Sequence, residues 1–360
     1  MTSPSTAPRP YDATGDLPFV SLILAVRNEA GFIGPCIEAV ALQDYPRDRF
    51  EVILIDGEST DATLPEARAA AARYELDLLI ETNRRLRTAP GLNLGLALAR
   101  GDVIIKVDGH IRIDPGFVSA GVDALRVHGA DVAGGPIRSE ARTPAGRAIA
   151  LAMSSRFGIG DAAFRYSNET RWTDSVPFGA YRRDVFERVG RFAEDIDRGE
   201  DDEFNYRLRQ AGGRILLTPR IGSVYYARES LAELRRQYWG YGVAKANVLL
   251  RHPGRLRPRH LVPSLFVATL ALGGAGVLVN RRFGWLVASA AGAYAIANAL
   301  ATAGIARRHG FWTLRYLPFA FATIHLAAGA GMIAGLLRHV SGRLPRRGGP
   351  GIGSPAATSR

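Results

Sequence analysis

The amino-acid sequence predicts an α/β fold with a parallel sheet, followed by a C-terminal helical membrane anchor. Three observations support this prediction. Apolar runs alternate with helical segments over residues 19–107, acidic residues directly follow two of these runs, and long apolar segments without any acidic residue follow residue 260. Strands that alternate with helices through short loops are typical of a parallel sheet covered by helices on both faces.

The predicted sheet is built from runs in which Val, Ile and Leu dominate, as expected for strands buried on both faces. We expect these strands at residues 19–26, 50–55, 76–80, 102–107 and 131–135. Helices are expected up to about Gln43, from residues 59–61 to about Tyr74, over residues 90–100 and from about Glu200 onward. Gly101 is expected to end the third of these helices.

The charge of the chain is unevenly distributed. The 360 residues carry a net charge of +12, but residues after Glu233 hold 17 of the 46 basic residues and none of the 34 acidic ones. Residues 1–233 therefore have 29 basic and 34 acidic residues, a net charge of −5. Basic residues that flank apolar segments are typical of an anionic membrane surface. We therefore expect membrane lipids as a partner, and no nucleic acid.

The C-terminal part contains one amphipathic and three apolar segments. Residues 234–252 are rich in Arg, Tyr and Trp, which favours a helix at the membrane interface. Residues 261–280, 283–306 and 316–337 each reach the roughly 20 residues that a membrane crossing needs. Three crossings would place the Arg-rich end of the chain opposite the α/β domain, against the usual distribution of positive charge. Two or three crossings, or buried helices of a soluble domain, are therefore open alternatives.

These segments predict the organisation of the whole chain. We expect a disordered leader over residues 1–16, an α/β domain over 17–233, and a basic amphipathic interface segment over 234–260. Two to three transmembrane helices over 261–337 and a basic disordered tail over 338–360 complete it.

Acidic residues follow two predicted strands. Asp56 in IDGESTD follows the second strand, and Asp108 in KVDGHIRID follows the fourth. Because parallel α/β sheets bind ligands beyond the carboxyl ends of their strands, Asp56 is a candidate to bind a nucleotide base or ribose. Glu29, after the first strand, is a second candidate for the same contact. The alternatives are a turn or helix-capping residue for Asp56 and a solvated loop acid for Glu29.

Asp108-Gly109-His110 resembles a D-x-D motif that ends in His. A nucleoside diphosphate leaving group accumulates negative charge, which a divalent cation stabilises as a Lewis acid. Carboxylate and imidazole ligands both suit Mn²⁺, whereas Mg²⁺ prefers oxygen. We therefore expect Asp108 and His110 to form a site for Mg²⁺ or Mn²⁺ and the diphosphate. A histidine that serves only in packing is the alternative for His110.

The acidic run Glu200-Asp201-Asp202-Glu203 begins the last predicted helix of the α/β domain. One of its carboxylates is a candidate general base, and a solvated helix N-terminus is the alternative. Trp172 and Phe178 are candidates for contact with a sugar or an acceptor, or else core aromatics. A donor site, a cation site and a base together describe a nucleotide-sugar transferase.

In this order and spacing, the motifs resemble those of the family 2 inverting glycosyltransferases, which have the Rossmann-like GT-A fold. Within that family, the chain is most similar to the ExoA-type succinoglycan glucosyltransferases over about residues 19–260. The segments that carry the resemblance are VRNEAGFIGPCIEAV, IDGESTDAT, APGLNLGLALARGDVIIKVDGHIRIDPGFV, VPFGAYRRDVFERVG, GEDDEFNYRLRQAGGRI and RQYWGYGVAKANVLLRHPGRLRPRH.

The resemblance implies a role for each candidate residue. Glu29 and Asp56 would hold the nucleotide, Asp108 with His110 the cation and diphosphate, and Asp201, beside Glu200, would be the catalytic base. The Q-x-x-R-W signature of processive synthases is not reproduced, which predicts the addition of one sugar rather than a polymer.

The predicted function is the transfer of one hexose, with glucose from UDP-glucose as the expected donor, to a polyprenyl-linked saccharide. The catalytic domain would lie on the cytoplasmic side of a bacterial inner membrane, in exopolysaccharide or cell-surface glycan synthesis. A polyprenyl-phosphate glycosyltransferase and a catalytically silent membrane scaffold with the same fold are the rival hypotheses.

Overall fold

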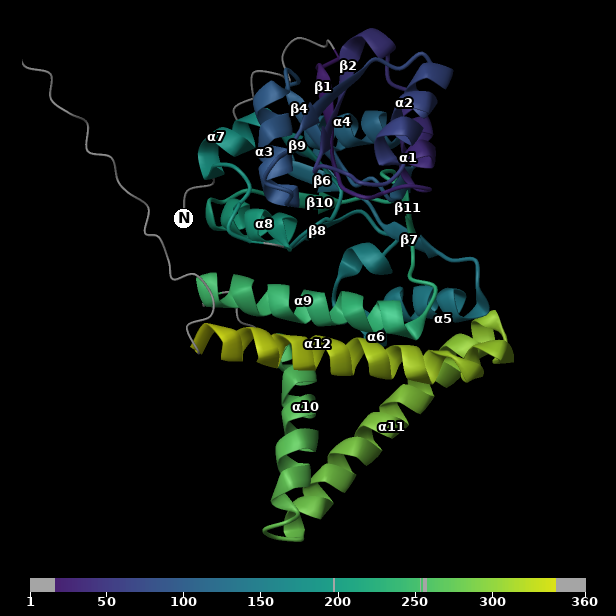
Figure 1. Cartoon of the computed structure of the whole chain (residues 1–360), viewed down its shortest axis with the longest axis vertical. Helices are drawn as coiled ribbons and strands as arrows, with labels where there is room; N and C mark the ends of the chain where they lie inside the picture. Colours follow the sequence, from purple (N-terminus) through teal and green to yellow (C-terminus); the bar gives the residue numbers. More distant parts are fainter. Residues whose placement is uncertain (1–16, 197, 253, 255–257, 341–360) are drawn as a thin grey trace, which may run out of the picture.

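The computed structural model describes residues 17–340 apart from residues 197, 253 and 255–257. The expected leader over 1–16 and the tail beyond residue 340 lie outside these residues. Figure 1 shows three levels along the long axis of the molecule: an α/β unit, a layer of two long helices that run side by side, and a pair of helices that projects away from that layer.

An eight-stranded sheet forms the centre of the α/β unit, with the strand order β3-β2-β1-β4-β9-β6-β10-β8. Its strands are β1 (Val20–Val26), β2 (Phe50–Asp56), β3 (Leu78–Thr82), β4 (Val103–Val107), β6 (Val132–Gly134), β8 (Arg171–Thr173), β9 (Gly179–Arg182) and β10 (Ile215–Leu217). The predicted parallel arrangement is confirmed for β1 to β4, with β1 between β2 and β4. As a result, the carboxyl ends of β2 and β4, where Asp56 and Asp108 lie, flank the end of β1.

Helices cover both faces of this sheet. The helices on one face are α1 (Ile33–Ala41), α2 (Thr63–Arg73) and α4 (Phe117–His128), and those on the other are α3 (Thr88–Leu98), α7 (Arg183–Val189) and α8 (Glu200–Gln210). Helix α3 ends at Leu98, so the prediction that Gly101 terminates it is wrong. A side chain at Gly101 would come within 2.5 Å of the backbone nitrogen of Ser21, and this close approach of β1 explains the glycine.

A second sheet extends the α/β unit toward the long helices. It has the order β5-β11-β7 and consists of β5 (Ile111–Ile113), β7 (Ile137–Glu140) and β11 (Ser223–Tyr226). Next to it lie α5 (Pro144–Met153) and α6 (Arg156–Ile159). Short 3-10 turns complete the structure: η2 (Arg47–Arg49), η3 (Ala163–Arg165) and η5 (Phe311–Arg315).

The two long helices of the layer are α9 (Leu231–Arg251) and α12 (Leu317–Val340), which lie side by side (Figure 1). Glycines allow their backbones to touch. A side chain at Gly242 would lie 2.2 Å from the carbonyl oxygen of Ala328, and one at Gly331 would lie 2.2 Å from that of Trp239. The first half of α12 also joins the α/β core, because Phe321 is fully buried and packs edge-on against Phe157.

Helices α10 (Pro258–Gly276) and α11 (Arg282–His309) form a hairpin that points away from the layer (Figure 1). By length and composition, α11 and α12 are apolar enough to cross a membrane, and residues 261–276 form a shorter apolar helix. The three predicted apolar segments are thus all helical, but α12 lies along α9 whereas α10 and α11 leave the layer.

Candidate functional site

The carboxyl ends of β1, β2 and β4 meet at a pocket of about 180 Å³, which we call the strand-end pocket. Four stretches of chain and the start of α8 contribute to it. Its lining residues are Ala25, Val26, Arg27, Glu29, Ile55, Gly57, Asn83, Leu86, Arg87, Thr88, Asp108, Gly109, His110 and Glu200. Four of the candidate residues from widely separated positions in the sequence therefore line one cavity: Glu29, Asp108, His110 and Glu200.

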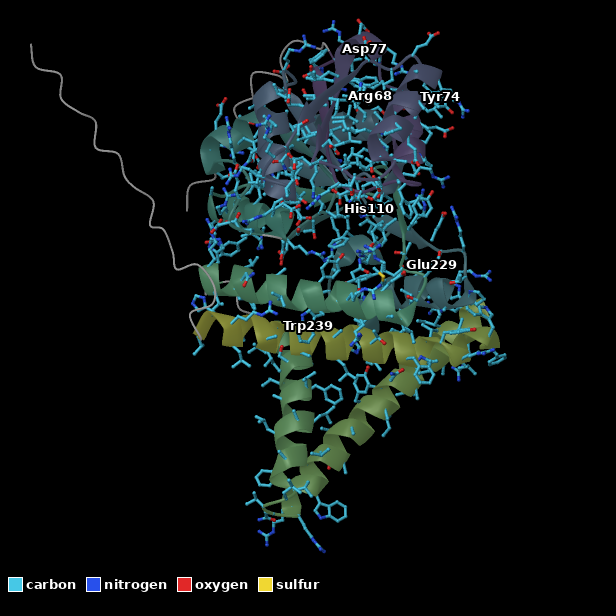
Figure 2. The ribbon with its side chains drawn as sticks, in the orientation of Figure 1. Arg68, Tyr74, Asp77, His110, Glu229 and Trp239 are labelled. Carbon is cyan, nitrogen blue, oxygen red and sulfur yellow. The ribbon has the colours of Figure 1, made fainter. Side chains whose placement is uncertain are left out.

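Glu29 and His110 form a pair on the wall of this pocket. Nδ1 of His110 lies 2.9 Å from Oε1 of Glu29. Burial alone would lower the pKa of His110, but the hydrogen bond to Glu29 and the charges of Asp108 and Glu29 raise it above its ordinary value. Because Nδ1 is held by Glu29, the Nε2 atom remains available to a ligand. Figure 2 shows His110 in the part of the α/β unit that is nearer to the long helices.

Lys106 links Asp108, at the end of β4, to Glu200, at the start of the acidic run. Its ammonium group is 3.5 Å from Oδ1 of Asp108 and 3.0 Å from Oε1 of Glu200. The side chain is buried, and burial disfavours its charged form. The carboxylates of Asp108, Glu200 and Asp201 nevertheless raise the pKa of Lys106 above its ordinary value. A buried cation therefore fixes the start of α8 against the end of β4.

Asp201, the predicted base, follows Glu200 on the first turn of α8 and does not itself line the strand-end pocket. Burial raises its pKa to about 7, with Lys106 acting against this shift and Glu200, Asp202 and Asp108 adding to it. A group with a pKa near neutrality both accepts and releases a proton at physiological pH, which suits general acid–base chemistry. The predicted assignment of Asp201 as the base is compatible with this environment.

Asp56 lies at the end of β2, and its side chain is turned into the protein. Its two carboxylate oxygens accept hydrogen bonds from the backbone nitrogen of Ser59 at 3.3 and 3.1 Å. The next residue, Gly57, lines the strand-end pocket, whereas Asp56 does not. The structure thus shows the turn-stabilising role that was the alternative for Asp56, directly beside the pocket.

The two aromatic candidates do not line the strand-end pocket. Phe178 is buried in the hydrophobic core, as in the alternative that the sequence left open for it. Trp172 lies on β8, the last strand of the sheet, and the guanidinium group of Arg214 stacks on its ring at 3.8 Å. Their positions follow from packing, which the sequence around them did not reveal.

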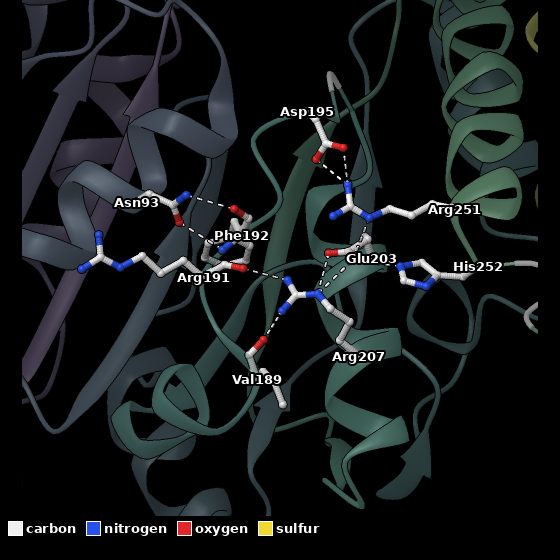
Figure 3. A network of polar contacts seen from close by, with 9 residues as sticks. All are labelled: Asn93, Val189, Arg191, Phe192, Asp195, Glu203, Arg207, Arg251 and His252. Carbon is white, nitrogen blue, oxygen red and sulfur yellow. Dashed lines mark hydrogen bonds and ion pairs between the residues drawn. The ribbon is translucent and has the colours of Figure 1, made fainter. Parts of the chain in front are cut away.

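The acidic run divides into two pairs. Glu200 lines the strand-end pocket and Asp201 follows it without lining the pocket, whereas Asp202 and Glu203 form pairs that hold α8 in place. Glu203 is fully buried and accepts hydrogen bonds from Arg207 at 2.8 Å and pairs with His252 at 3.0 Å. Figure 3 shows this network, in which Arg207 also donates to the carbonyl oxygens of Val189 and Arg191. The network connects α8 to the loop before it and to the end of α9.

The donor set suits a divalent cation that is shared with a phosphate ligand. Among the described residues, no group of three or more His, Cys, Asp and Glu side chains is placed to hold a metal. Asp108 and His110 would supply two ligands, and the Glu29–His110 pair is the carboxylate–histidine arrangement that orients metal-binding imidazoles. Cations that act on diphosphates are commonly bound by one or two protein ligands together with phosphate oxygens and water.

The sequence analysis missed Lys106, although the sequence contains a signal for it. Lys106 and Lys245 are the only lysines among 46 basic residues, and Lys106 stands inside an apolar strand. In the structure, both lysines pair with the acidic run. Lys245, on α9, lies 3.2 Å from Asp202. An isolated charge in a buried strand requires a partner, so the position itself indicates an ion pair.

Comparisons with known proteins concern the family and the fold of the chain. Residues 21–190 match the family model described as Glycosyl transferase family 2. Succinoglycan biosynthesis protein ExoA of Rhizobium meliloti is 29% identical over 277 residues, which cover 77% of this chain and 82% of that protein.

A second relative is the dolichyl N-acetyl-alpha-D-glucosaminyl phosphate 3-beta-D-2,3-diacetamido-2,3-dideoxy-beta-D-glucuronosyltransferase of Methanococcus voltae. It is 29% identical over 233 residues, 63% of this chain and 73% of that protein.

Among solved structures, the mannosyltransferase PcManGT from Pyrobaculum calidifontis in complex with GDP-Man and Mn²⁺ aligns with a TM-score of 0.54. Its sequence identity is 24%, and the alignment covers 90% of this chain and 88% of that one. The chain therefore has a GT-A-like α/β fold.

Proposed function

We propose, on the premise that residues 21–190 match the glycosyl transferase family 2 model, that the protein is a membrane-anchored, inverting hexosyltransferase. It moves one hexose, glucose from UDP-glucose, to a polyprenyl-linked saccharide during assembly of a bacterial exopolysaccharide or cell-surface glycan. The relatives, whose names refer to succinoglycan biosynthesis and to a dolichyl-linked sugar phosphate, support a lipid-linked acceptor.

The observation on which the proposal rests is the convergence of the acidic motifs. Glu29, Asp108 and Glu200 come from three distant stretches of chain and line one pocket at the carboxyl ends of the parallel strands. Asp201, with its pKa raised to about 7, follows on the same helical turn as Glu200. Ligands of open α/β sheets bind at this edge.

Each group has a role in the proposed reaction. The nucleotide lies against Glu29 and the turn at Asp56, and its diphosphate lies against Asp108 and His110. A divalent cation, Mg²⁺ or Mn²⁺, bound there would stabilise the negative charge of the departing diphosphate. The acceptor hydroxyl attacks the anomeric carbon opposite the diphosphate, and Asp201 takes the hydroxyl proton, so that the configuration inverts.

The membrane anchor follows from the direction of the helices. In α10, the apolar residues 261–276 span about 24 Å, somewhat less than the roughly 30 Å of a bilayer core. We propose that α10 and α11 cross the membrane and that α12 lies in the interface beside α9. This arrangement leaves residues 338–340 on the same side as the α/β unit, as the distribution of basic residues favours. Residues 17–233 then form the catalytic domain on the cytoplasmic side, and the anchor begins with 234–260.

The proposed topology predicts which side of the membrane two engineered cysteines face. Val279 at the tip of the hairpin is 88% exposed and Val340 at the end of α12 is 84% exposed, whereas the native Cys36 is buried. In sealed inverted vesicles, an impermeant maleimide should label Val340→Cys from outside and Val279→Cys only after permeabilisation. If Val340→Cys is also protected, α12 crosses the membrane and the chain has three crossings.

The proposed activity is tested by transfer to lipid. The full chain is incubated with bacterial lipid extract and a panel of labelled nucleotide sugars, with EDTA, Mg²⁺ or Mn²⁺. We expect one labelled glucose on a polyprenyl-linked product from UDP-glucose, and no product with EDTA or with Asp108→Asn. As a matched control, Arg68→Gln on the distant helix α2 should transfer normally (Figure 2).

The outcomes of this assay separate the alternatives. Another donor in the panel would correct the sugar, and labelled polyprenyl phosphate would indicate the polyprenyl-phosphate transferase. A polymer would indicate a processive synthase. If no nucleotide sugar is transferred or hydrolysed while the chain remains folded, the enzymatic proposal is wrong and a scaffold role is favoured.

A further inference from the structure

A second pocket, of about 700 Å³, lies where the turn between α11 and α12 meets the start of α5. We call it the α5–η5 pocket. Its lining residues are Pro144, Arg147, Phe311, Trp312, Leu314, Arg315 and Tyr316. It shares no lining residue with the strand-end pocket, and Figure 1 shows α8 and the α11–α12 turn toward opposite sides of the molecule. The α5–η5 pocket is therefore separate from the proposed catalytic site.

The α5–η5 pocket lies at the depth of a membrane surface if α11 crosses the bilayer. Helix α11 is apolar until it ends with Arg307, Arg308 and His309, and η5 follows directly. Basic residues at the end of a membrane helix typically lie at the level of lipid headgroups. The pocket opens immediately beyond that basic end.

The surface of the pocket is both basic and apolar. Within the described part of the chain, neither Arg147 nor Arg315 forms an ion pair, and the sequence has no acidic residue after Glu233. Instead, Arg147 stacks on the ring of Trp312 at 5.5 Å, and Arg315 lies 5.4 Å from the ring of Tyr316. Stacking keeps the guanidinium donors free for an anion.

Large apolar side chains border these arginines. Phe311 is 76% exposed and Leu314 is 46% exposed. Trp312 is partly exposed, and its indole nitrogen donates to the carbonyl oxygen of His309 at 2.9 Å. Aromatic rings with one polar edge are typical of the membrane interface, where acyl chains cover the apolar part.

One carboxylate, that of Glu229, approaches the start of α5, and its acceptors are already occupied. It accepts hydrogen bonds from the backbone nitrogens of Arg142 at 2.9 Å and Thr143 at 3.0 Å. It does not line the α5–η5 pocket. Among the described residues, no ion pair joins Glu229 to Arg147 or Arg315, so both guanidinium groups keep their donors for a ligand.

We propose that the α5–η5 pocket binds the headgroup of an anionic phospholipid, with its phosphate between Arg147 and Arg315 and its acyl chains over Phe311 and Leu314. The proposal depends on the membrane anchoring included in the proposed function. The two arginines attract the negatively charged phosphodiester, and the apolar rim suits the acyl chains attached to it. A lipid held here would fix the α/β unit at one height and tilt above the bilayer.

The test measures which lipid lies next to Trp312. The full chain is placed in phosphatidylcholine nanodiscs that contain a minor fraction of phosphatidylglycerol, and one of the two lipids carries brominated acyl chains. Bromine quenches nearby tryptophan fluorescence, and Trp312→Phe gives the signal of the other three tryptophans for subtraction. We expect phosphatidylglycerol to be enriched at Trp312 on the order of fivefold for each arginine.

Variants and a competitor decide the outcome. Arg147→Gln with Arg315→Gln should remove the enrichment, the double Lys variant should retain part of it, and Arg68→Gln should leave it unchanged. Equal quenching by both lipids in the unaltered chain, or enrichment that survives the double Gln variant, would overturn the proposal. Displacement by a trace of undecaprenyl phosphate would also overturn it, because the occupant would then be a polyprenyl lipid.

The test is independent of the proposed reaction, because it uses neither donor nor acceptor. Enrichment without any glycosyl transfer would contradict the proposed function alone, whereas transfer without enrichment would contradict only the lipid site. Circular dichroism of each variant distinguishes a lost site from a lost fold.

Discussion

Replacing Asp201 by Asn is expected to lower the rate of sugar transfer about 10²–10⁴-fold, the usual contribution of a general base. Asn has nearly the same shape but takes no proton from the acceptor hydroxyl. The affinity for the nucleotide sugar should change little, because Glu29, Asp108 and His110 remain in place. Product formation in the lipid assay and donor binding by calorimetry measure the two effects separately.

The pH dependence of the unaltered enzyme should reflect the same group. With a pKa raised to about 7, Asp201 is increasingly protonated below that pH, so the transfer rate should fall as the pH decreases through neutrality. Folding stability should change in the opposite direction. The folded chain binds a proton that the unfolded chain releases near pH 4, so stability decreases as pH rises from about 4 to 7.

Two measurements would contradict the assignment of Asp201. A variant that keeps most of its turnover would exclude Asp201 as the base, and it would favour an acceptor that is already an anion, such as a polyprenyl phosphate. A loss of activity with a lower melting temperature at pH 8 would indicate a structural role. Because Asn removes a buried carboxylate, we expect the melting temperature of Asp201→Asn to be no lower than that of the unaltered chain.

Replacing Lys106 by Met is expected to reduce both stability and activity. The change leaves Glu200 buried without its cation, and breaking a buried ion pair typically costs about 3–5 kcal/mol. Lys106 is also the group that lowers the pKa of Asp201 most, so that pKa should rise further when the ammonium is removed. The midpoint of the pH–rate profile should therefore move to a higher pH.

The second lysine provides a matched control. Lys245 pairs with Asp202 in a more exposed position, so Lys245→Met should cost about 0–1 kcal/mol and leave the pH–rate profile in place. Lys106→Arg, which keeps the positive charge, should move the midpoint of the pH–rate profile back toward that of the unaltered chain. If Lys106→Met loses stability but its pH midpoint stays unchanged, Lys106 holds α8 without influencing the base.

The order of strands and helices in the first part of the α/β unit could be predicted, because apolar runs and helical spacing depend on neighbouring residues. The apolar runs that became β1, β2 and β4 fix which strands are buried, and a buried parallel sheet then aligns their carboxyl ends. The positions of Asp56 and Asp108 at that edge follow directly. The same local reasoning left the role of Phe178 open, because a single aromatic residue gives no indication of whether it faces a core or a cavity.

The sequence by itself determined the strands β1 to β4 with the helices between them, the acidic motifs at the strand ends and the separation of charge between the two halves of the chain. Only the tertiary structure decided how the acidic run is divided, which cation joins β4 to α8, and that α12 lies beside α9 rather than along the hairpin. The reason is physical: periodicity and charge are read from neighbouring residues, whereas an ion pair such as Lys106–Glu200 joins positions 94 residues apart. The direction of α12 likewise depends on glycine contacts with another helix, which hydropathy does not encode.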